Sequence, residues 1–422
     1  MHQPYLLVSS ILAAAFIASS RVGAQTPAPD DIFFDDSGVK SISIAINSRD
    51  WENLKVHYLE NTYYPCDFKW EGQTIRNIGI RSRGTGSRSG VKPGLRVDFN
   101  RYTTDQTFLG LKSVVLRNDV QDPSTMHERI SMLFFRRMGL PAPREAHTRL
   151  YINNEYTGLY TIVESIDKNF LKRTYGEDGG YLFKYDYNVD DAPYYLEWRG
   201  SDAANYVPHP FKPETHEDDP HPETVAELIR IVNQDSDAIL RRTVAAYLDL
   251  EKFIRHIAVE AFLADNDGFN GNYGTNNFYF YRFEKSTVFN FIAWDKSNGF
   301  NDGPGYPIWH NILDAVEENR LTMRALAYDD LRQLFLDTLL ACARSLEETV
   351  DGSPVTANNP GWMVREVDRE YDQVKDWAAL SEEDKQSYSR EQFEGEVENL
   401  RNFARLRGDF VRGEVARARG EQ

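Results

Sequence analysis

Cysteine is scarce in this chain, since only Cys66 and Cys342 occur among 422 residues. So low a content excludes a small scaffold held together by disulfides and excludes a cysteine-based metal site. One long-range disulfide and two unpaired buried thiols both remain open, because the sequence gives no distance between the two residues.

Positive charge is also in deficit. Lys and Arg number 48 against 65 Asp and Glu, and the formal net charge is −17. A nucleic-acid partner requires a basic footprint, so we expect no nucleic acid among the partners. An acidic surface suits cations as cofactors instead.

Beyond the first residues the chain has no apolar run long enough for a membrane span. The opening run "YLLVSSILAAAFIASS" is followed by "RVGAQTPAPDD", which predicts a secretory signal peptide over residues 1–24 with cleavage near Ala24. A linker is expected over 25–39. The mature protein is then expected to be secreted, periplasmic or extracellular and to keep no integral span.

Several familiar ligand motifs are missing as well. The histidines show no H-E-x-x-H spacing for zinc. An EF-hand on "DNDGFNGNYGTN" fails, because a loop beginning at Asp265 would need Gly at 270 and Glu at 276, and both positions are Asn.

The apolar pattern predicts an α+β fold. Period-two alternation in "VKSISIAIN", "CDFKWEGQTIRNIGIRSRG" and "LRVDFNR", and a hairpin in "TRLYINNEYTGLYTIVESI", indicate a sheet-rich first part. A helix within "DPSTMHERISMLFFRRMGLPAP" is expected to be capped by Asp122 or Ser124 and to end at Gly139. "GGYLFKYDY" predicts one more strand. We expect a sheet-rich lobe at about 40–190 and a helical lobe at about 220–420, interrupted by a single hairpin.

That hairpin carries the candidate chemistry. "NFYFYRF" and "VFNFIAWD" predict two strands joined by a short turn, so the start of the first and the end of the second lie at the same end. This geometry places Asn277 next to Asp295. A helix ending near Ala264 delivers Asp265 and Asp267 into the preceding glycine-rich loop. We therefore expect three acceptor side chains to converge: Asp267, Asn277 and Asp295.

Their order along the chain is the one that phosphoryl transfer by protein kinases uses. There, one Asp orients the attacking hydroxyl or accepts its proton, while Asn and a second Asp hold Mg²⁺ on the phosphates. The ten positions from Asp267 to Asn277 exceed the spacing in H-R-D-x-x-x-x-N, so a conventional protein kinase is excluded. A G-x-G-x-x-G loop followed by V-A-I-K is also absent. The turn "RSRGTGSRSGVK" could meet phosphates through its amides and through Arg81, Arg83 or Lys92.

Several segments resemble, in order, landmarks of the spore-coat protein H (CotH) kinase-like family. They are "NIGIRSRGTGS", "KPGLRVDF", "VVLRNDVQDPSTMHERISMLFFRRMGLPAP", "TRLYINNEYTGLYTIVESID", "GYLFKYD", "NDGFNGNYGTNNFYFYR" and "FIAWDKSNGF". The resemblance covers roughly residues 40–410. It implies an atypical protein-kinase-like fold with a sheet-rich N-terminal lobe and a mainly helical C-terminal lobe. It also implies phosphorylation of protein hydroxyls that depends on ATP and on Mg²⁺ or Mn²⁺, with an extracellular or coat protein as substrate.

The resemblance also implies individual roles. Asp267 in "NDGF" looks like the catalytic Asp, and Asn277 in "NNFYFY" and Asp295 in "AWD" look like the metal ligands. Ser297 stands where the family commonly has a second Asp, so one carboxylate ligand is missing.

Nucleotide contacts are expected from Lys184 and Lys92, whose ammonium groups suit ATP phosphates. Arg83 is a further candidate, and Glu164 is expected to pair with one of the lysines, as kinases pair a Lys with a Glu. For Lys184 and Glu164, a half-exposed strand lysine and a structural ion pair are the competing interpretations.

Two other functional classes remain open. A non-catalytic extracellular or coat-assembly protein could retain the same fold. A carboxylate-based hydrolase of extracellular polysaccharide is the weaker alternative, because no pair of carboxylates is seen to flank a sugar site.

Overall fold

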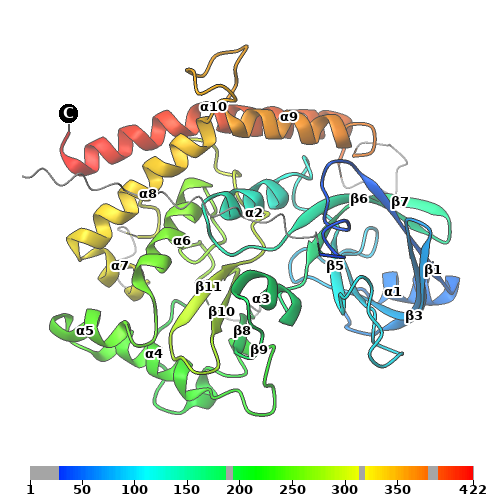
Figure 1. Cartoon of the computed structure of the whole chain (residues 1–422), viewed down its shortest axis with the longest axis horizontal. Coiled ribbons are helices and arrows are strands. Elements are labelled where there is room, and N and C mark those ends of the chain that lie inside the picture. Colours follow the sequence, from blue (N-terminus) through cyan, green and yellow to red (C-terminus); the bar gives the residue numbers. More distant parts are fainter. Residues whose placement is uncertain (1–27, 187–192, 313–318, 379–387, 422) are drawn as a thin grey trace, which may run out of the picture.

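The computed structural model describes residues 28–186, 193–312, 319–378 and 388–421. It is a mixed α/β structure in which a barrel lies on one side and most of the helices lie on the other (Figure 1). The predicted signal peptide, residues 1–24, lies outside the described residues. No helix in the described part of the chain is both long and apolar enough to cross a membrane.

Seven strands form a closed barrel in the order β1-β2-β3-β4-β5-β7-β6. Parallel pairing of β1 with β6 closes the barrel, with Ile42 opposite Leu150, and the other pairs are antiparallel. The strands are β1 (Lys40–Ile46), β2 (Tyr64–Trp70), β3 (Gln73–Ser82), β4 (Leu95–Asp98), β5 (Ser113–Arg117), β6 (Glu145–Ile152) and β7 (Glu155–Glu164); helix α1 (Ser48–Val56) joins the first two. Alternating apolar side chains fill the barrel, as their period-two pattern predicts.

The described part of the predicted linker packs against this barrel. Phe33 is buried and meets Phe68, Trp70 and Phe108 edge to face. Arg144 on the barrel side pairs with Asp31 at 2.5 Å. These contacts anchor the first described residues to the barrel.

Helix α2 (His127–Arg137) interrupts the barrel strands between β5 and β6. The predicted cap is wrong in position, because Met126 is the N-cap and no side chain caps the helix from that position. Asp122 Oδ2 accepts the His127 amide at 2.8 Å and Ser124 Oγ accepts the Met126 amide at 3.1 Å, so both residues hold the turn that precedes the helix. Gly139 adopts φ +76° just beyond the helix, a conformation that glycine adopts without steric cost. The helix and its predicted end are therefore confirmed, whereas it starts beyond the predicted capping residues.

The second sheet has four strands in the order β11-β10-β8-β9. These are β8 (Tyr181–Tyr185), β9 (Phe211–Pro213), β10 (Phe278–Arg282) and β11 (Phe289–Ala293), with α3 (Lys168–Tyr175) leading into β8. The sequence predicts the β10–β11 hairpin and the strand β8, but it does not predict that β8 joins them, with Lys184 opposite Tyr279. Alternation identifies a strand without identifying its partner.

Helices cover one face of this sheet, and among them α6 contacts β11 (Figure 1). They pack around one large apolar core that includes residues of α2 and of the sheet. The helices are α4 (Glu223–Gln234), α5 (Asp237–Val244), α6 (Leu250–Phe262), α7 (Arg320–Leu326), α8 (Asp329–Glu347), α9 (Trp362–Val374) and α10 (Arg390–Arg419), and η1 (Ala203–Asn205) is a short 3₁₀ turn.

Both cysteines are buried free thiols, so the free-thiol alternative is confirmed. Cys66 lies on β2 in the barrel and Cys342 lies on α8 in the helical core. Burial raises the pKa of Cys66 to about 12, which makes its thiol a poor nucleophile at neutral pH.

Candidate active site

The open end of the β10–β11 hairpin brings Asn277 and Asp295 together. Phe278 pairs with Ala293, and just beyond this pair the Trp294 amide donates to the Asn277 carbonyl at 3.2 Å. Asn277 and Asp295 both leave their strands with positive φ, at +58° and +50°. The proximity predicted from the hairpin is therefore confirmed.

Asp267 lies against the same end, in the loop that follows α6, and side-chain amides hold its carboxylate. Asn276 donates to Oδ1 at 2.9 Å, while Asn277 and Asn298 donate to Oδ2 at 3.0 and 2.9 Å. Burial raises the pKa of Asp267 to about 6 against the effect of these hydrogen bonds, and the nearby charges of Asp265 and Asp295 act in the same direction as burial. A carboxylate with this pKa is suited to take a proton near neutral pH.

A guanidinium holds Asp295 instead. Arg117, at the end of β5, donates to Asp295 Oδ1 at 2.6 Å and lies 3.3 Å from Glu128 on α2. Burial by itself would raise the pKa of Asp295, but the charge and the hydrogen bond of Arg117 outweigh it and lower the pKa to about 2. Asp295 is therefore ionised at any physiological pH.

A buried ion-pair network fixes the backbone around both carboxylates. Lys296, next to Asp295, lies 3.0 Å from Asp265 and also pairs with Glu260 of α6. Asp265 Oδ1 accepts the Asp267 amide at 3.1 Å, and Glu260 Oε2 accepts the Phe269 amide at 2.9 Å. Asp265 thus shapes the loop, whereas Asp267 faces the site.

Arg83, one of the predicted cationic residues, lies beside this arrangement. Its guanidinium is 5.7 Å from the Trp294 ring centre. Burial and the charge of Arg117 lower the pKa of Arg83 to about 10, and Asp295 acts in the opposite direction. Arg83 and Arg117 together place positive charge beside Asp295.

The two predicted lysines have other partners. Lys92 is buried with its ammonium 5.2 Å from the Tyr160 ring centre, and burial lowers its pKa to about 8 while Asp119 and Asp122 oppose the shift. Lys184 on β8 pairs with Asp186 at 2.8 Å.

The predicted pairing of Glu164 with one of these lysines is wrong. Glu164 is buried and accepts hydrogen bonds from Arg144 and Arg173, at 2.7 Å in each case. A buried carboxylate in the apolar run "YTIVESI" needs a cationic partner. The sequence of this run does not show which Lys or Arg becomes that partner in the folded protein. The structural alternative for Glu164 is the one observed.

The oxygen donors at the hairpin end have the chemistry that a divalent cation needs. The described residues contain no group of three or more His, Cys, Asp and Glu placed to hold a metal ion. Asp267 and Asp295 nevertheless supply carboxylate oxygens, and the Asn277 amide, whose nitrogen donates to Asp267, keeps its oxygen for another partner. Hard oxygen donors of this kind fit Mg²⁺ or Mn²⁺.

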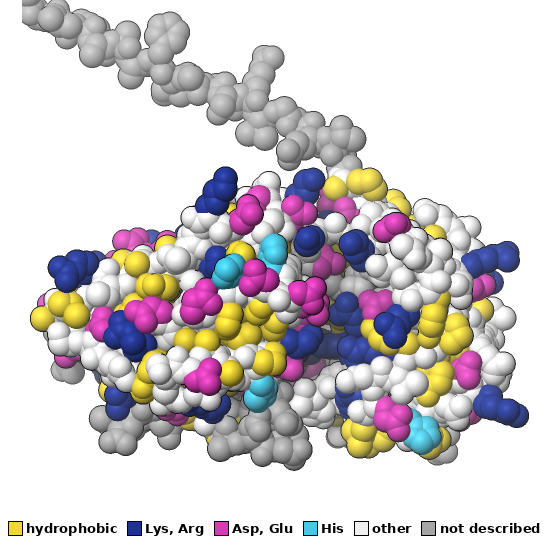
Figure 2. All heavy atoms as spheres, turned by 90° about the horizontal axis from the view of Figure 1, so that it is seen from below, with side chains coloured by type: hydrophobic (Ala, Val, Ile, Leu, Met, Phe, Trp, Pro, Cys, Tyr) yellow, Lys and Arg dark blue, Asp and Glu magenta, His cyan; other side chains and the backbone are white. Residues whose placement is uncertain are grey.

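Seen from below, the molecule is hollowed between its barrel side and its helical side (Figure 2). Lys and Arg side chains gather within this hollow, although the chain as a whole is acidic. A locally basic hollow in an acidic protein favours an anionic ligand.

Sequence reasoning left three contributors without a role at the site: Arg117, Asn276 and Asn298. None of the three is among the predicted site residues. The asparagines in "YGTNNF" and in "KSNGF" are the sequence feature that could have indicated Asn276 and Asn298 as partners of Asp267.

The hairpin brings the loop that carries Asp267 next to Asp295, and basic residues lie beside them. A site of this class is suited to an anionic ligand that binds together with a metal cation. Residues 80–411 match the family described as CotH kinase protein, and the chain belongs to this family.

The chain is also similar to two proteins of Bacillus subtilis (strain 168). It is 24% identical to inner spore coat protein H over 74% of this chain and 83% of that protein. It is 32% identical to an inner spore coat protein H-like protein over 17% of this chain and 23% of that protein.

Among solved structures, the Shewanella oneidensis MR-1 complex of the toxin-antitoxin proteins HipA and HipB with operator DNA contains a similar chain. The TM-score is 0.35 and the identity 12%, over 72% of this chain and 61% of that one.

Proposed function

We propose that this protein is an atypical kinase that transfers the γ-phosphate of ATP to hydroxyl groups of a protein substrate. The observation that carries the proposal is the meeting of Asp267, Asn277 and Asp295 at the open end of the hairpin. Membership in the CotH kinase family supports it. The barrel and the helical side would then be the two lobes of an atypical kinase fold.

Each residue has a role in this proposal. Asp267 orients the acceptor hydroxyl and takes its proton, for which its raised pKa is suited. Asn277 and Asp295 would hold Mg²⁺ or Mn²⁺, which supplies charge neutralisation for the ATP phosphates when bound. Arg83 and Arg117 add positive charge for the phosphates, and Lys184 and Lys92 remain further candidates.

The location and the partner are part of the proposal. One relative is named an inner spore coat protein, and the opening residues have the pattern of a signal peptide. We therefore propose an extracellular or coat-associated protein that acts on another extracellular or coat protein.

Incubation with Mn²⁺ and ATP labelled at either the γ- or the α-phosphate tests the reaction. Kinase activity predicts that only the γ-label reaches protein. Transfer of the α-label would identify nucleotide transfer instead, and transfer of neither label to any protein, the chain itself included, would contradict the proposal.

The Arg117–Asp295 pair favours one second candidate, a non-catalytic assembly protein. Because Arg117 already neutralises Asp295 and Ser297 adds no carboxylate, the fold could persist without a metal. Calorimetry separates the two candidates: an absence of heat on titrating Mn²⁺ and ATP into the folded protein would favour the assembly protein.

A further inference from the structure

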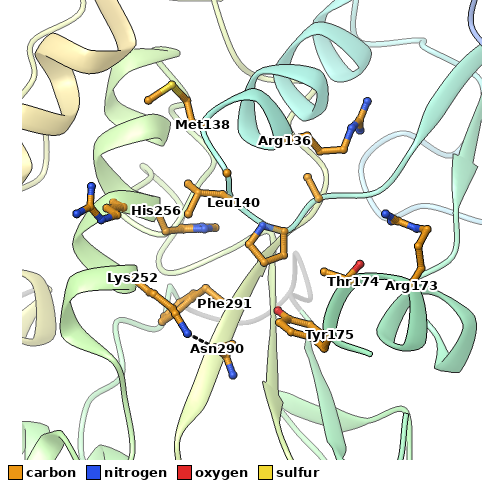
Figure 3. A pocket seen from close by; sticks show the side chains of 14 residues that line it. Arg136, Met138, Leu140, Arg173, Thr174, Tyr175, Lys252, His256, Asn290 and Phe291 are labelled. Carbon is orange, nitrogen blue, oxygen red and sulfur yellow. Dashed lines mark hydrogen bonds between the residues drawn. The ribbon is translucent and has the colours of Figure 1, made fainter. Parts of the chain in front are cut away.

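A second cavity lies on the outer edge of strand β11, apart from the candidate active site. Its volume is about 500 Å³, which is within the range of small-molecule sites. The walls come from the end of α2 and the loop after it, from α3, from α6 and from β11 (Figure 3).

Cations dominate the charge of this cavity. Arg136, Arg173, Lys252 and Arg255 line it, and no Asp or Glu is among its lining residues. Arg173 is engaged by Glu164, and Lys252 contacts Asn290 at 3.2 Å and Asp249 at 3.5 Å. Arg136 donates to the Pro143 carbonyl and lies within the electrostatic reach of the buried Glu145. Within the described residues, Arg255 forms no ion pair. In a chain with a net charge of −17, such a lining selects for anions.

Unpaired polar groups accompany the cations. The hydroxyl groups of Thr174 and Tyr175 are buried without a hydrogen-bond partner among the described residues, and the Tyr175 hydroxyl points toward the cavity (Figure 3). Buried polar groups in proteins normally have a partner, so these two are available for a ligand or for ordered water.

The edge of β11 supplies main-chain groups. The Phe289 amide donates outward to Tyr247 at 2.8 Å and the Ala293 amide donates outward to Pro141 at 3.1 Å. Because alternate residues of a strand direct their main-chain groups to the same side, those of Phe291 face the cavity between these two bonds. An edge strand with open groups is a common recognition element.

The remaining wall is apolar. Met138, Leu140 and Pro141 from the loop after α2, together with the Phe291 side chain, line it (Figure 3). Apolar lining with a few polar and charged groups is typical of sites for small organic molecules.

We propose that this cavity binds a small organic anion, in which a phosphate or carboxylate group is joined to a flat apolar part. The anionic group would meet Lys252 and Arg255, and the apolar part would lie against Leu140 and Phe291. The site is separate from the hairpin end, although His256 in its wall contacts Glu260, which also pairs with Lys296.

Calorimetric titration with phenyl phosphate tests the proposal, and benzoate in a second titration distinguishes a phosphate ligand from a carboxylate. Inorganic phosphate, which lacks the aromatic ring, and phenol, which lacks the anionic group, are titrated for comparison as the two half-ligands. At least one aromatic anion is expected to bind about tenfold or more tightly than either half-ligand.

The double variant Lys252→Glu, Arg255→Glu is expected to lose about tenfold or more of this affinity, because both side chains are exposed on α6 and their charge is reversed. Lys285→Glu in the exposed β10–β11 turn is the matched control and is expected to bind unchanged. Asp267→Asn is also expected to bind unchanged, which keeps this test independent of the proposed kinase reaction.

Three results would overturn the proposal: no binding of either aromatic anion, equal binding of phenol, or equal affinity in the charge-reversed variant. Thermal unfolding of each variant checks that a loss of binding does not come from a loss of folding.

Discussion

The two carboxylates of the candidate site have opposite surroundings. Asp267, in the loop after α6, is held by three neutral amides and has a pKa raised to about 6. Asp295, after β11, is held by the Arg117 guanidinium and has a pKa lowered to about 2. When the surroundings of two carboxylates separate their pKa values in this way, one carboxylate can transfer protons while the other stays ionised and binds a cation.

The two pKa shifts assign the two carboxylates to different roles. A permanently ionised Asp295 is suited to a cation and poorly suited to proton transfer. Asp267, which titrates near neutrality, is suited to proton transfer.

Removing either carboxylate is expected to have the largest effect. Asp267→Ala and Asp295→Ala should each lower the rate of γ-phosphate transfer by about 10²–10⁴-fold, the usual contribution of a positioned acid-base group or charge. A labelled-ATP assay measures the change. Asp218→Ala, at an exposed residue of the loop before α4, is the matched control and should keep its activity. Full activity in both site variants would show that Asp267 and Asp295 are not the catalytic and metal-binding residues.

The Arg117→Met variant is expected to have a lower free energy of unfolding than the unchanged protein. It leaves Glu128 and Asp295 without their shared cation, and breaking a buried pair costs about 3–5 kcal/mol of unfolding free energy. Urea unfolding measures this loss. Arg137→Met removes the more exposed pair with Glu348 and should cost about 1 kcal/mol or less. Equal costs for the two variants would show that the Arg117 pairs contribute no more than a surface pair.

The transfer rate should fall as pH decreases through about 6, the raised pKa of Asp267. The carboxylate must be ionised to accept a proton, so the active fraction is present above this pKa and falls about tenfold per pH unit below it. A pH-rate profile at saturating ATP measures the midpoint. A rate that stays flat between pH 5 and pH 7, taken as approximate limits, would argue against Asp267 as the base.

Asn298→Ala should move that midpoint upward. The hydrogen bond from Asn298 lowers the pKa of Asp267, and its loss removes a stabilising interaction of about 1 kcal/mol from the ionised form. The expected shift is therefore roughly one pH unit or less. Asn301→Ala, whose amide contacts Asn298 and not Asp267, serves as the control.

Lys184→Ala should have the smallest effect. Its pair with Asp186 is partly exposed, so the unfolding free energy should change by less than about 1 kcal/mol. If Lys184 contacts ATP, KM for ATP rises while stability stays constant. An unchanged KM would leave Lys184 as a surface residue.

The sequence predicts the parts of the fold that local pattern determines. Helix α2 follows from its apolar pattern and from the glycine at its end, and the β10–β11 hairpin follows from two aromatic strands and a short turn. From that hairpin alone, Asn277 and Asp295 are correctly placed side by side.

Partners distant in sequence are not predicted. Arg117 and Asp295 are 178 positions apart, and the pair forms only when the barrel meets the hairpin. The pairing of β8 with β10 and the engagement of Glu164 by Arg144 and Arg173 depend on folding in the same way. No local spacing encodes these contacts, because tertiary packing decides them.

The most direct test of the divided roles is calorimetric titration of Mn²⁺ and ATP into Asp267→Asn and Asp295→Asn, alongside the unchanged protein. We expect Asp267→Asn to keep nucleotide binding while it loses transfer, and Asp295→Asn to lose binding by about tenfold or more. Binding that is unchanged in Asp295→Asn and lost in Asp267→Asn would contradict this expectation.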